Sequence, residues 1–370
     1  MHMDEFKHLA GERQPAPPTS HANRPTAVRL VTSVTPWLII GGLLWAGLFI
    51  KPQPVGTTVQ PPIVERRDHY YGMAMPTPGR ILLAGSNGKI VALGQDGRAE
   101  RLKTPTERSL QDIAAWDAEH AVAVGNDGVI LHTADGGASW TQAADVPRSQ
   151  VANKLNRVRV GSNGVALATG EMGALLMSSD QGRTWTRLRP EEDIAWNDAA
   201  ILPDGTIIAV GEFGNIALSG DGGKSWKDIK GPVQASLMAI SFRDANTGVA
   251  VGLEGIALIT RDAGHTWARI DLKAHDHLFD IAWDSTGQRW LGTGSLARWV
   301  SIEADGKQWK TGRLDERDLS WHTRVVPDGP VAWFAGANVG RWDGTTWQAL
   351  GDAWQPTTLM NLPLPAKKTP

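Results

Sequence analysis

The chain has 370 residues, a formal net charge of −2, 41 glycines, 17 tryptophans and no cysteine. The near-neutral charge gives no indication of nucleic-acid binding, and the lack of cysteine excludes disulfides and thiolate metal sites. This length predicts either two domains or one large repeat architecture. Abundant glycine and tryptophan favour the second, with many tight turns and one aromatic anchor in each unit.

An uncharged segment, mostly apolar, runs from Leu30 to Ile50 between the charges of Arg29 and Lys51. About 20 helical residues cross the ~30 Å hydrocarbon layer of a membrane, so we predict a transmembrane helix at 30–50. A buried core helix and a cleaved signal peptide are the alternatives. A long stretch precedes the segment and no A-x-A site follows Ile50, which favours an uncleaved anchor.

Basic residues flank the segment unequally. Arg24 and Arg29 stand just before it, whereas after Lys51 the next basic residue is Arg66. The positive-inside rule therefore predicts a single-pass inner-membrane protein with a cytoplasmic N-terminus and a periplasmic main domain. The expected boundaries are 1–29 for a cytoplasmic tail, 30–50 for the span, 51–66 for a Pro-rich linker, 67–360 for the main domain and 361–370 for a flexible tail.

One motif, [ST]-x-D-x-G-x-[ST]-W, recurs along the main domain. Weaker copies centre on Asp96, Asp305 and Asp343. The aspartates stand about 40 residues apart, which is the length of four short strands and their turns, or one propeller blade. The four strong copies contribute Asp135, Gly137 and Trp140; Asp180, Gly182 and Trp185; Asp221, Gly223 and Trp226; and Asp262, Gly264 and Trp267.

Each unit also reads as short strands. Apolar runs such as 121–125 and 207–211 end at a glycine, and a G-x-x-G turn joins each run to a partner such as 128–133. A further strand begins each unit, for example at 110–116. Because helical periodicity is not evident after residue 70, we predict an all-β fold, a seven-bladed β-propeller.

The motif, termed the Asp box below, has a structural rationale. The aspartate can accept hydrogen bonds from the N–H groups of its own turn, and the glycine two residues later can adopt a positive φ. The hydroxyl residues can tie the ends of the turn together, and the indole can pack against the next element. We therefore interpret the box as a staple for a hairpin and not as a catalytic device.

The combined signature G-x-x-G-x-[IL]-x-x-[ST]-x-D-x-G-x-[ST]-W resembles the BNR/Asp-box repeats of the photosystem II stability/assembly factor family and its bacterial relatives. The resemblance implies a seven-bladed propeller that acts, without cofactor or small-molecule substrate, as an assembly or scaffold factor for a membrane protein complex. Its membrane-anchored bacterial relatives are associated with transporters of the resistance-nodulation-division type, which implies an accessory role. The N-terminal anchor departs from the lumenal photosystem factors, which are made as cleavable precursors.

Enzymatic alternatives find little support in the residues. A sialidase needs a tyrosine nucleophile, a glutamate and an arginine triad, but the only tyrosines, Tyr70 and Tyr71, stand before the first complete blade by this reading. We therefore expect no enzyme. The alternative is a carbohydrate-active or glycan-binding Asp-box propeller, which would gather acids and aromatic residues at the mouth of its channel.

Three other clusters have plainer interpretations. The pair Glu191-Glu192 and the arginines at 183, 187 and 189 read as solvated edges of the ring. The run His275-Asp276-His277 has no distant third ligand, so we expect a polar loop and no metal.

The G-x-x-G turns should lie on the face opposite the boxes. Two-residue hairpin loops favour Gly, Asn and Asp, so apolar residues at their tips are unexpected. They can tuck over the channel mouth, or they can form a docking patch for a partner protein. The candidate partner-binding residues are Glu171, Met172, Glu212, Phe213, Leu253 and Glu254.

Overall fold

The computed structural model describes residues 26–49, 68–94 and 98–350, with side chains in the helix from residue 34 to 48. The chain divides into two units, and each is treated by itself. The predicted linker, the C-terminal tail, most of the N-terminal tail and the box aspartate Asp96 lie outside the described residues.

The first unit contains helix α1 (Thr26–Phe49), which includes most of the predicted span 30–50. Large apolar side chains of α1 are exposed, among them Trp37, Leu38 and Leu48. Among the residues that the structure describes, no helix meets both the length and the hydropathy that a membrane crossing requires. The transmembrane anchor therefore stays a prediction.

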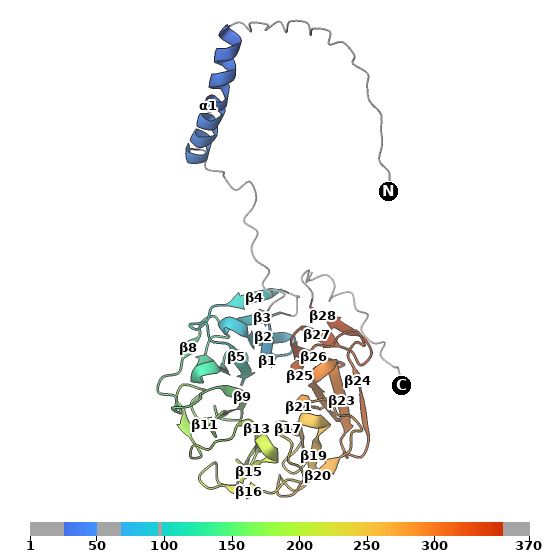
Figure 1. Ribbon diagram of the computed structural model, residues 1–370. Coiled ribbons are helices and arrows are strands. Elements are labelled where there is room, and N and C mark those ends of the chain that lie inside the picture. The colour runs from blue at the N-terminus through green and yellow to red at the C-terminus, as the bar shows by residue number, and fades with distance from the viewer. Residues whose placement is uncertain (1–25, 50–67, 95–97, 351–370) are drawn as a thin grey trace, which may run out of the picture. The chain divides into compact units, whose positions relative to one another are not determined.

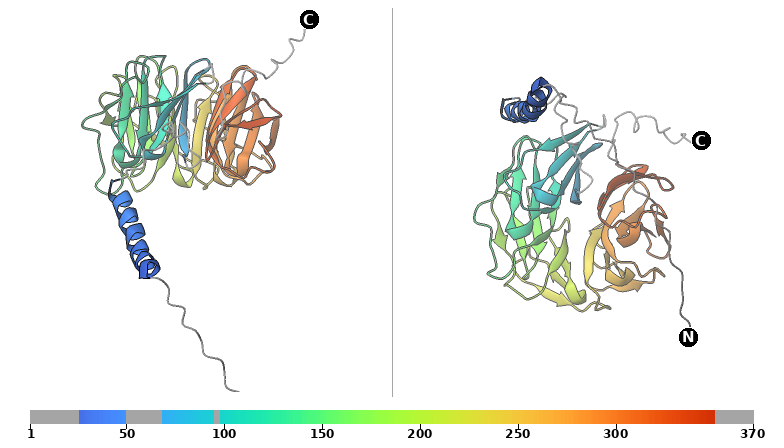
Figure 2. Two further views of the ribbon diagram at one scale, coloured as in Figure 1. Left: turned by 90° about the horizontal axis from the view of Figure 1, so that it is seen from above. Right: turned by 45° about the horizontal axis from the view of Figure 1, so that its top comes forward.

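The second unit is a ring of seven antiparallel sheets, each made of four strands that follow one another in the chain (Figure 1). The prediction of an all-β, seven-bladed propeller is confirmed. We number the sheets as blades 1 to 7 in chain order. Seen from the side, the strands run between the two faces of the ring (Figure 2).

Blade 1 contains β1 (Tyr70–Thr77), β2 (Arg80–Gly85), β3 (Ile90–Leu93) and β4 (Ala99–Leu102); blade 2 contains β5 (Leu110–Ala115), β6 (Ala121–Gly125), β7 (Ile130–Thr133) and β8 (Thr141–Gln142); blade 3 contains β9 (Leu155–Val160), β10 (Ala166–Gly170), β11 (Leu175–Ser178) and β12 (Thr186–Arg187). Blade 4 contains β13 (Trp196–Ile201), β14 (Ile207–Gly211), β15 (Ile216–Ser219) and β16 (Lys227–Ile229); blade 5 contains β17 (Leu237–Phe242), β18 (Gly248–Gly252), β19 (Ala257–Thr260) and β20 (Ala268–Ile270). Blade 6 contains β21 (Leu278–Asp284), β22 (Arg289–Gly294), β23 (Arg298–Glu303) and β24 (Trp309–Arg313); blade 7 contains β25 (His322–Asp328), β26 (Val331–Gly336), β27 (Val339–Trp342) and β28 (Trp347–Ala349).

The first strand of every blade lies innermost, so β1, β5, β9, β13, β17, β21 and β25 surround the axis (Figure 1). The ring closes between blades 1 and 7 without exchanging a strand between the described blades. An apolar cluster that includes Tyr70 and Trp333 joins these two blades, and Thr323 Oγ1 donates to the carbonyl of Tyr71 across the junction at 2.9 Å. The tyrosines therefore begin blade 1, so placing them before the first complete blade was wrong.

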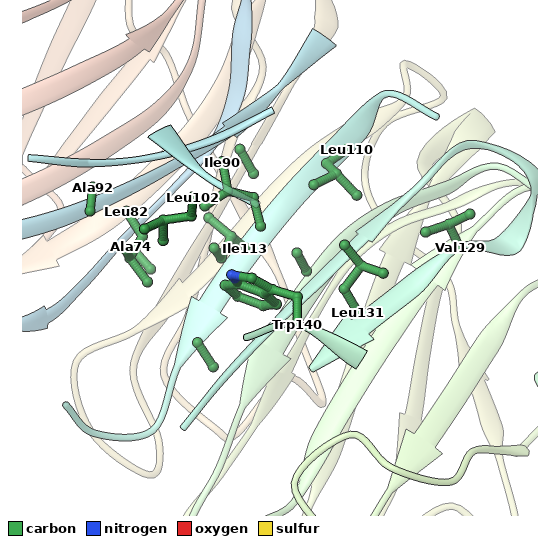
Figure 3. Close-up of a cluster of buried hydrophobic side chains, with 13 residues drawn as sticks. Ala74, Leu82, Ile90, Ala92, Leu102, Leu110, Ile113, Val129, Leu131 and Trp140 are labelled. Carbon is green, nitrogen blue, oxygen red and sulfur yellow. The ribbon is translucent and has the colours of Figure 1, made fainter. Parts of the chain in front are cut away.

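Apolar layers fill the space between neighbouring blades. Between blades 1 and 2, Trp140 packs with Leu102, Ile113 and Leu131 (Figure 3). A Cβ atom added to Gly137 would approach Leu102 Cδ1 to 2.7 Å, which places the box of blade 2 directly on blade 1. Each strong box thus staples its own hairpin and also packs against the preceding blade.

The four strong boxes join the third and fourth strands of blades 2 to 5, and their hydrogen bonds repeat. In blade 3, Asp180 accepts hydrogen bonds from Ser178 Oγ at 2.8 Å, from Thr184 Oγ1 at 2.7 Å and from the Thr184 N–H at 3.0 Å. Gly182 has a φ of 85°, and Trp185 Nε1 donates to its carbonyl at 2.9 Å. The staple interpretation is confirmed in detail, except that the buried Nε1 of Trp140 has no hydrogen-bond partner.

The G-x-x-G turns join the second and third strands, on the opposite face of the ring. Five blades have a single 3-10 turn here: η1 (Ser86–Gly88), η2 (Asn126–Gly128), η3 (Glu212–Gly214), η4 (Leu253–Gly255) and η5 (Ser295–Ala297), in which Ala297 replaces the second glycine. The second residue of each turn has a positive φ, which holds for Phe213 at 55° and for Met172 at 54° in the equivalent turn of blade 3. We call this side the turn face and the other the box face.

Candidate functional site at the channel mouth

The channel opens on the turn face into a cavity of about 620 Å³, which we call the mouth. Glu171, Glu212 and Ser295, the first residues of three turns, line its rim, and second residues of the inner strands line its wall. A pocket of this volume is typical of a small-molecule site or of the seat of a protruding side chain.

One half of the wall is aromatic and apolar. Tyr71 of blade 1 stacks parallel to Trp321, with 5.7 Å between ring centroids and 4° between planes. Phe279 and Met238 continue this surface onto blades 6 and 5. The ring closure between blades 1 and 7 therefore creates the aromatic wall.

The other half of the wall is polar and belongs to blades 2 to 4. Gln111, Lys154, Asn156 and Asn197 line it. The Nδ2 of Asn197 is used internally, because it donates to the Leu237 carbonyl at 2.8 Å. The mouth is thus divided between an aromatic side and a side rich in amides.

A buried network of three aspartates and three arginines forms the floor. Asp198 accepts Arg159 Nε at 2.9 Å and Nη2 at 2.6 Å, and Arg157 Nη1 donates to Asp280 at 2.7 Å. Arg324 Nε donates to Asp112 at 2.8 Å. Arg157 and Arg324 line the mouth directly, and Arg159 lies on the box-face side of the same network.

Each of the three floor aspartates also ties its blade to the next. The second carboxylate oxygen accepts an inner-strand N–H of the following blade at 2.9 to 3.0 Å; the donors are Val158 for Asp112, Ile240 for Asp198 and Val325 for Asp280. The carboxylates therefore satisfy backbone donors that no ladder partner reaches, and the arginines balance their charge.

Asp198 of the floor is held in its ionised form. Burial alone would raise the pKa of Asp198, but the charges of Arg159 and Arg157 outweigh burial and hold the pKa below its usual value. The same pairing keeps the pKa of Arg159 above its usual value although burial opposes it. For Arg324, burial and the nearby Arg157 lower the pKa, while Asp112 and Asp280 act in the opposite direction.

Arg324 faces Asp112 with two nitrogens. Its Nε donates to Oδ1 at 2.8 Å, and its Nη2 lies 2.8 Å from Oδ2. The Arg324 side chain is only 6 % exposed, so this ion pair is shielded from solvent.

The predicted partner-binding residues separate by position in their turns. Glu171 and Glu212 point toward the mouth, and Glu212 accepts the Ala195 N–H at 2.8 Å. Phe213 is 68 % exposed, and Glu254 is also exposed. Met172 and Leu253 are half-buried. The structure therefore brings acids to the rim and presents Phe213 to solvent; a binding role for the six remains a prediction.

The other clusters form no site of their own. His277 Nδ1 accepts the Glu254 N–H, Asp276 pairs with Arg298, and the described residues contain no group able to hold a metal ion. Arg189 lies over the rings of Trp196 and Trp226 and pairs with Glu192. These residues serve packing between blades.

The inner-strand aspartates of the floor were not predicted. Their signal was an isolated Asp as the third residue of an otherwise apolar strand, as in Leu110-Gln-Asp112-Ile113 and Leu278-Phe-Asp280-Ile281. A charge at such a position needs a buried partner, but the partners come from other blades and only the closed ring identifies them.

Comparison with known proteins agrees with this geometry. A sequence model of the family "Photosynthesis system II assembly factor YCF48" matches residues 95–226. A search of curated proteins finds no match. The solved structure "YCF48 bound to D1 peptide" is 17 % identical, with a TM-score of 0.60, and covers 73 % of this chain and 91 % of its own.

Two further solved structures share the fold. YCF48 from Cyanidioschyzon merolae is 15 % identical, with a TM-score of 0.58 over 74 % of this chain and 94 % of its own. PorZ, a surface component of the type-IX secretion system of Porphyromonas gingivalis, is 14 % identical, with a TM-score of 0.58 over 77 % of this chain but only 38 % of its own.

The fold and the repeated boxes define a seven-bladed BNR propeller with a closed ring and a mouth on its turn face. Within that class, the chain is similar to YCF48: the family model matches residues 95–226, and the solved YCF48 structures share the fold of the ring.

Proposed function

We propose that this chain is a non-catalytic scaffold or assembly factor that docks a partner protein on the turn face. The observation that carries the proposal is the distribution of exposed apolar side chains. In the described part of the propeller, four large apolar side chains are exposed: Val151, Phe213, Leu296 and Leu319. Clustered exposed apolar groups mark interaction sites on proteins.

All four belong to the turn face. Phe213 and Leu296 are the second residues of η3 and η5. Val151 borders the same hollow as the tip residue Asp127 of blade 2. Leu319 precedes Ser320, whose carbonyl accepts the Ala297 N–H of η5. A partner that covers this face would remove all four from water.

The charged groups of the mouth support binding and not turnover. A sialidase presents free arginines to the substrate carboxylate and uses an acid to assist the reaction. Here the floor arginines pair with Asp112, Asp198 and Asp280, and Glu212 is tied to the backbone. The solved relative "YCF48 bound to D1 peptide" is a propeller that binds a peptide. We extend protein binding from that relative to this chain.

The proposal includes a membrane anchor. The segment 30–50 carries no charge, and the apolar side chains of α1, Trp37 and Leu38 among them, are exposed. We propose that it holds the propeller at the periplasmic side of the inner membrane, and that the partner is a membrane protein complex, with a resistance-nodulation-division transporter as one candidate.

The test replaces Phe213 with the photo-crosslinking residue p-benzoylphenylalanine in the full-length chain, in membranes of the source cell. Lys227, an exposed residue of β16, receives the same residue as the matched control. We expect one adduct from position 213, identified by mass spectrometry, and none from position 227. Replacing Val151, Leu296 and Leu319 by serine should abolish that adduct in a protein that still folds. Equal crosslinking at both positions, or an undiminished adduct in the serine variant, contradicts the proposal.

A further inference from the structure

The mouth itself differs in chemistry from the apolar rim around it. Its aromatic wall offers the parallel rings of Tyr71 and Trp321, and His69 contacts the Trp321 ring edge-on with 5.4 Å between centroids. Across the cavity stand amide side chains, of which Asn156 is one. A flat apolar surface facing amides suits a ligand that has an apolar face and a polar edge.

The floor closes the cavity without offering a free donor. Arg324 Nη2 lies 2.8 Å from Asp112 Oδ2, and Arg324 Nη1 donates to the Thr323 carbonyl. The polar atoms of a ligand must therefore be matched by the amide side of the wall, where Asn156 lines the mouth.

The charge of the floor decides which oxygen is suitable. Three arginines face three aspartates within one network, and each arginine has a carboxylate partner at 2.6 to 2.8 Å. Glu171 and Glu212 add negative charge at the rim, against the single cation of Lys154. A carboxylate or phosphate would meet no net positive field, so a neutral hydroxyl or carbonyl oxygen is favoured.

We propose that the mouth binds an uncharged saccharide of one or two units. One pyranose face packs on the wall of Tyr71 and Trp321, where the C–H groups of the ring meet the aromatic faces. Hydroxyl groups at the polar edge hydrogen-bond to the Asn156 amide. The cavity volume of about 620 Å³ accommodates a ligand of this size. The site stands independently of partner docking on the rim.

A peptide side chain is the competing occupant. An aromatic side chain would use the wall of Tyr71 and Trp321 but would leave the amide side without hydrogen-bond partners. A saccharide satisfies the aromatic wall and the polar groups together, so the combined chemistry favours it.

The test is ligand-observed saturation-transfer NMR with the full-length protein in detergent. The probes are maltose, cellobiose and N,N′-diacetylchitobiose, with N-acetylneuraminate as the acidic probe and N-acetyltryptophanamide as the peptide probe. We expect saturation transfer to at least one neutral disaccharide and to neither of the other two probes. Trp321→Ala and, with less disturbance to packing, Asn156→Ala should each weaken binding about tenfold.

Phe213→Ala serves as the control, because Phe213 lies on the exposed rim and does not line the mouth. It should leave saccharide binding unchanged while it weakens partner docking, so the two proposals can fail separately. The inference is overturned if no neutral disaccharide binds to the wild-type protein, or if only the acidic or the peptide probe binds. Saccharide binding that persists in both Trp321→Ala and Asn156→Ala overturns it as well.

Discussion

The tight turns on both faces of the ring contain residues in a left-handed backbone conformation, but the two faces use different residues there. In the four strong boxes of the box face, the position two residues after the aspartate has a positive φ and is always glycine, with 92° at Gly137 and 85° at Gly182, although the residue before that glycine is left-handed too and is Gln181 or Ala263 in two of the boxes. On the turn face, the equivalent left-handed position is taken by six residues with side chains, namely Asn87, Asp127, Met172, Phe213, Glu254 and Leu296. The left-handed region is uncommon for residues other than Gly, Asn and Asp.

This difference separates a face whose turn residues serve structure from a face that keeps side chains which the turn conformation disfavours. Glycine at the box lets the preceding blade approach closely, as Val122 approaches Gly182. An exposed phenylalanine does not. Left-handed residues with side chains occur on both faces, so the exposure of Phe213, and not backbone strain alone, selects the turn face.

The largest expected effect comes from the floor that separates the two faces. Asp198→Ala removes the partner of Arg159 and the acceptor of the Ile240 N–H, both inside the channel. Arg159 then keeps only its 3.6 Å ion pair with Asp280 and the Ile240 N–H loses its acceptor, so the free energy of unfolding should fall by about 3 kcal/mol. Urea denaturation followed by tryptophan fluorescence measures this loss of stability. Adding Arg159→Met to Asp198→Ala should restore part of the loss; a double variant less stable than Asp198→Ala would contradict the proposed role of the pair.

A smaller loss is expected at the box face. Asp180→Ala removes four hydrogen bonds, two of them from Thr184, and should cost about 1–2 kcal/mol, as the loss of a capping carboxylate does elsewhere. Ser179→Ala, at an exposed position within the same turn, is the control and should change stability little. Capture of the partner should stay the same in both variants. If Asp180→Ala lost the partner while remaining folded, the assignment of a purely structural role to the box face would fail.

The turn face should respond in the opposite direction. Phe213→Gly removes a side chain that is 68 % exposed and relieves a φ of 55°, so stability should stay level or rise by up to about 1 kcal/mol. The midpoint of thermal unfolding measures this. Gly182→Ala, the converse change at the box face, should destabilise. A clear loss of stability in Phe213→Gly would mean that the phenylalanine is retained for packing, and the contrast between the faces would disappear.

The sequence predicted features that are local to one turn. The box, its glycine and its tryptophan lie within eight positions, so the motif at Thr133 to Trp140 could be interpreted without knowing any other blade. The same holds for the number of blades, because the boxes recur at nearly even intervals. Each of these features depends on contacts between residues that are close together in the sequence.

The mouth and its floor depend on ring closure and were not predictable in this way. Arg324 meets Asp112, and Arg157 meets Asp280, only because distant blades meet at the axis. Tyr71 reaches Trp321 only when blade 7 returns to blade 1. At the turn tips, the G-x-x-G pattern located the pairs but could not tell that Glu171 and Glu212 line the mouth while Phe213 is exposed to solvent.

The smallest expected effect is a pH dependence of stability that arises on the box face. Hydrogen bonds, first from the Ser139 hydroxyl, lower the pKa of Asp135 to about 2, and those of Ser225 lower the pKa of Asp221 to about 2. Because an aspartate in the unfolded chain has a pKa near 3.9, the unfolded chain binds protons between about pH 4 and pH 2 that the folded boxes do not bind. The boxes therefore contribute stability that is fully present above about pH 4 and is lost as the pH falls to 2.

We expect the urea midpoint of the wild-type protein to fall across this window, and to fall less steeply when Asp135→Asn and Asp221→Asn are combined. Glu107→Gln, an exposed carboxylate outside any box, is the control for the loss of charge and should keep the wild-type slope. Partner docking through Phe213 carries no titrating group at its centre, so crosslinking at that position should not follow the same curve while the protein remains folded. An identical acid dependence in the double Asn variant and the wild type would show that the box carboxylates do not set the acid stability of the ring.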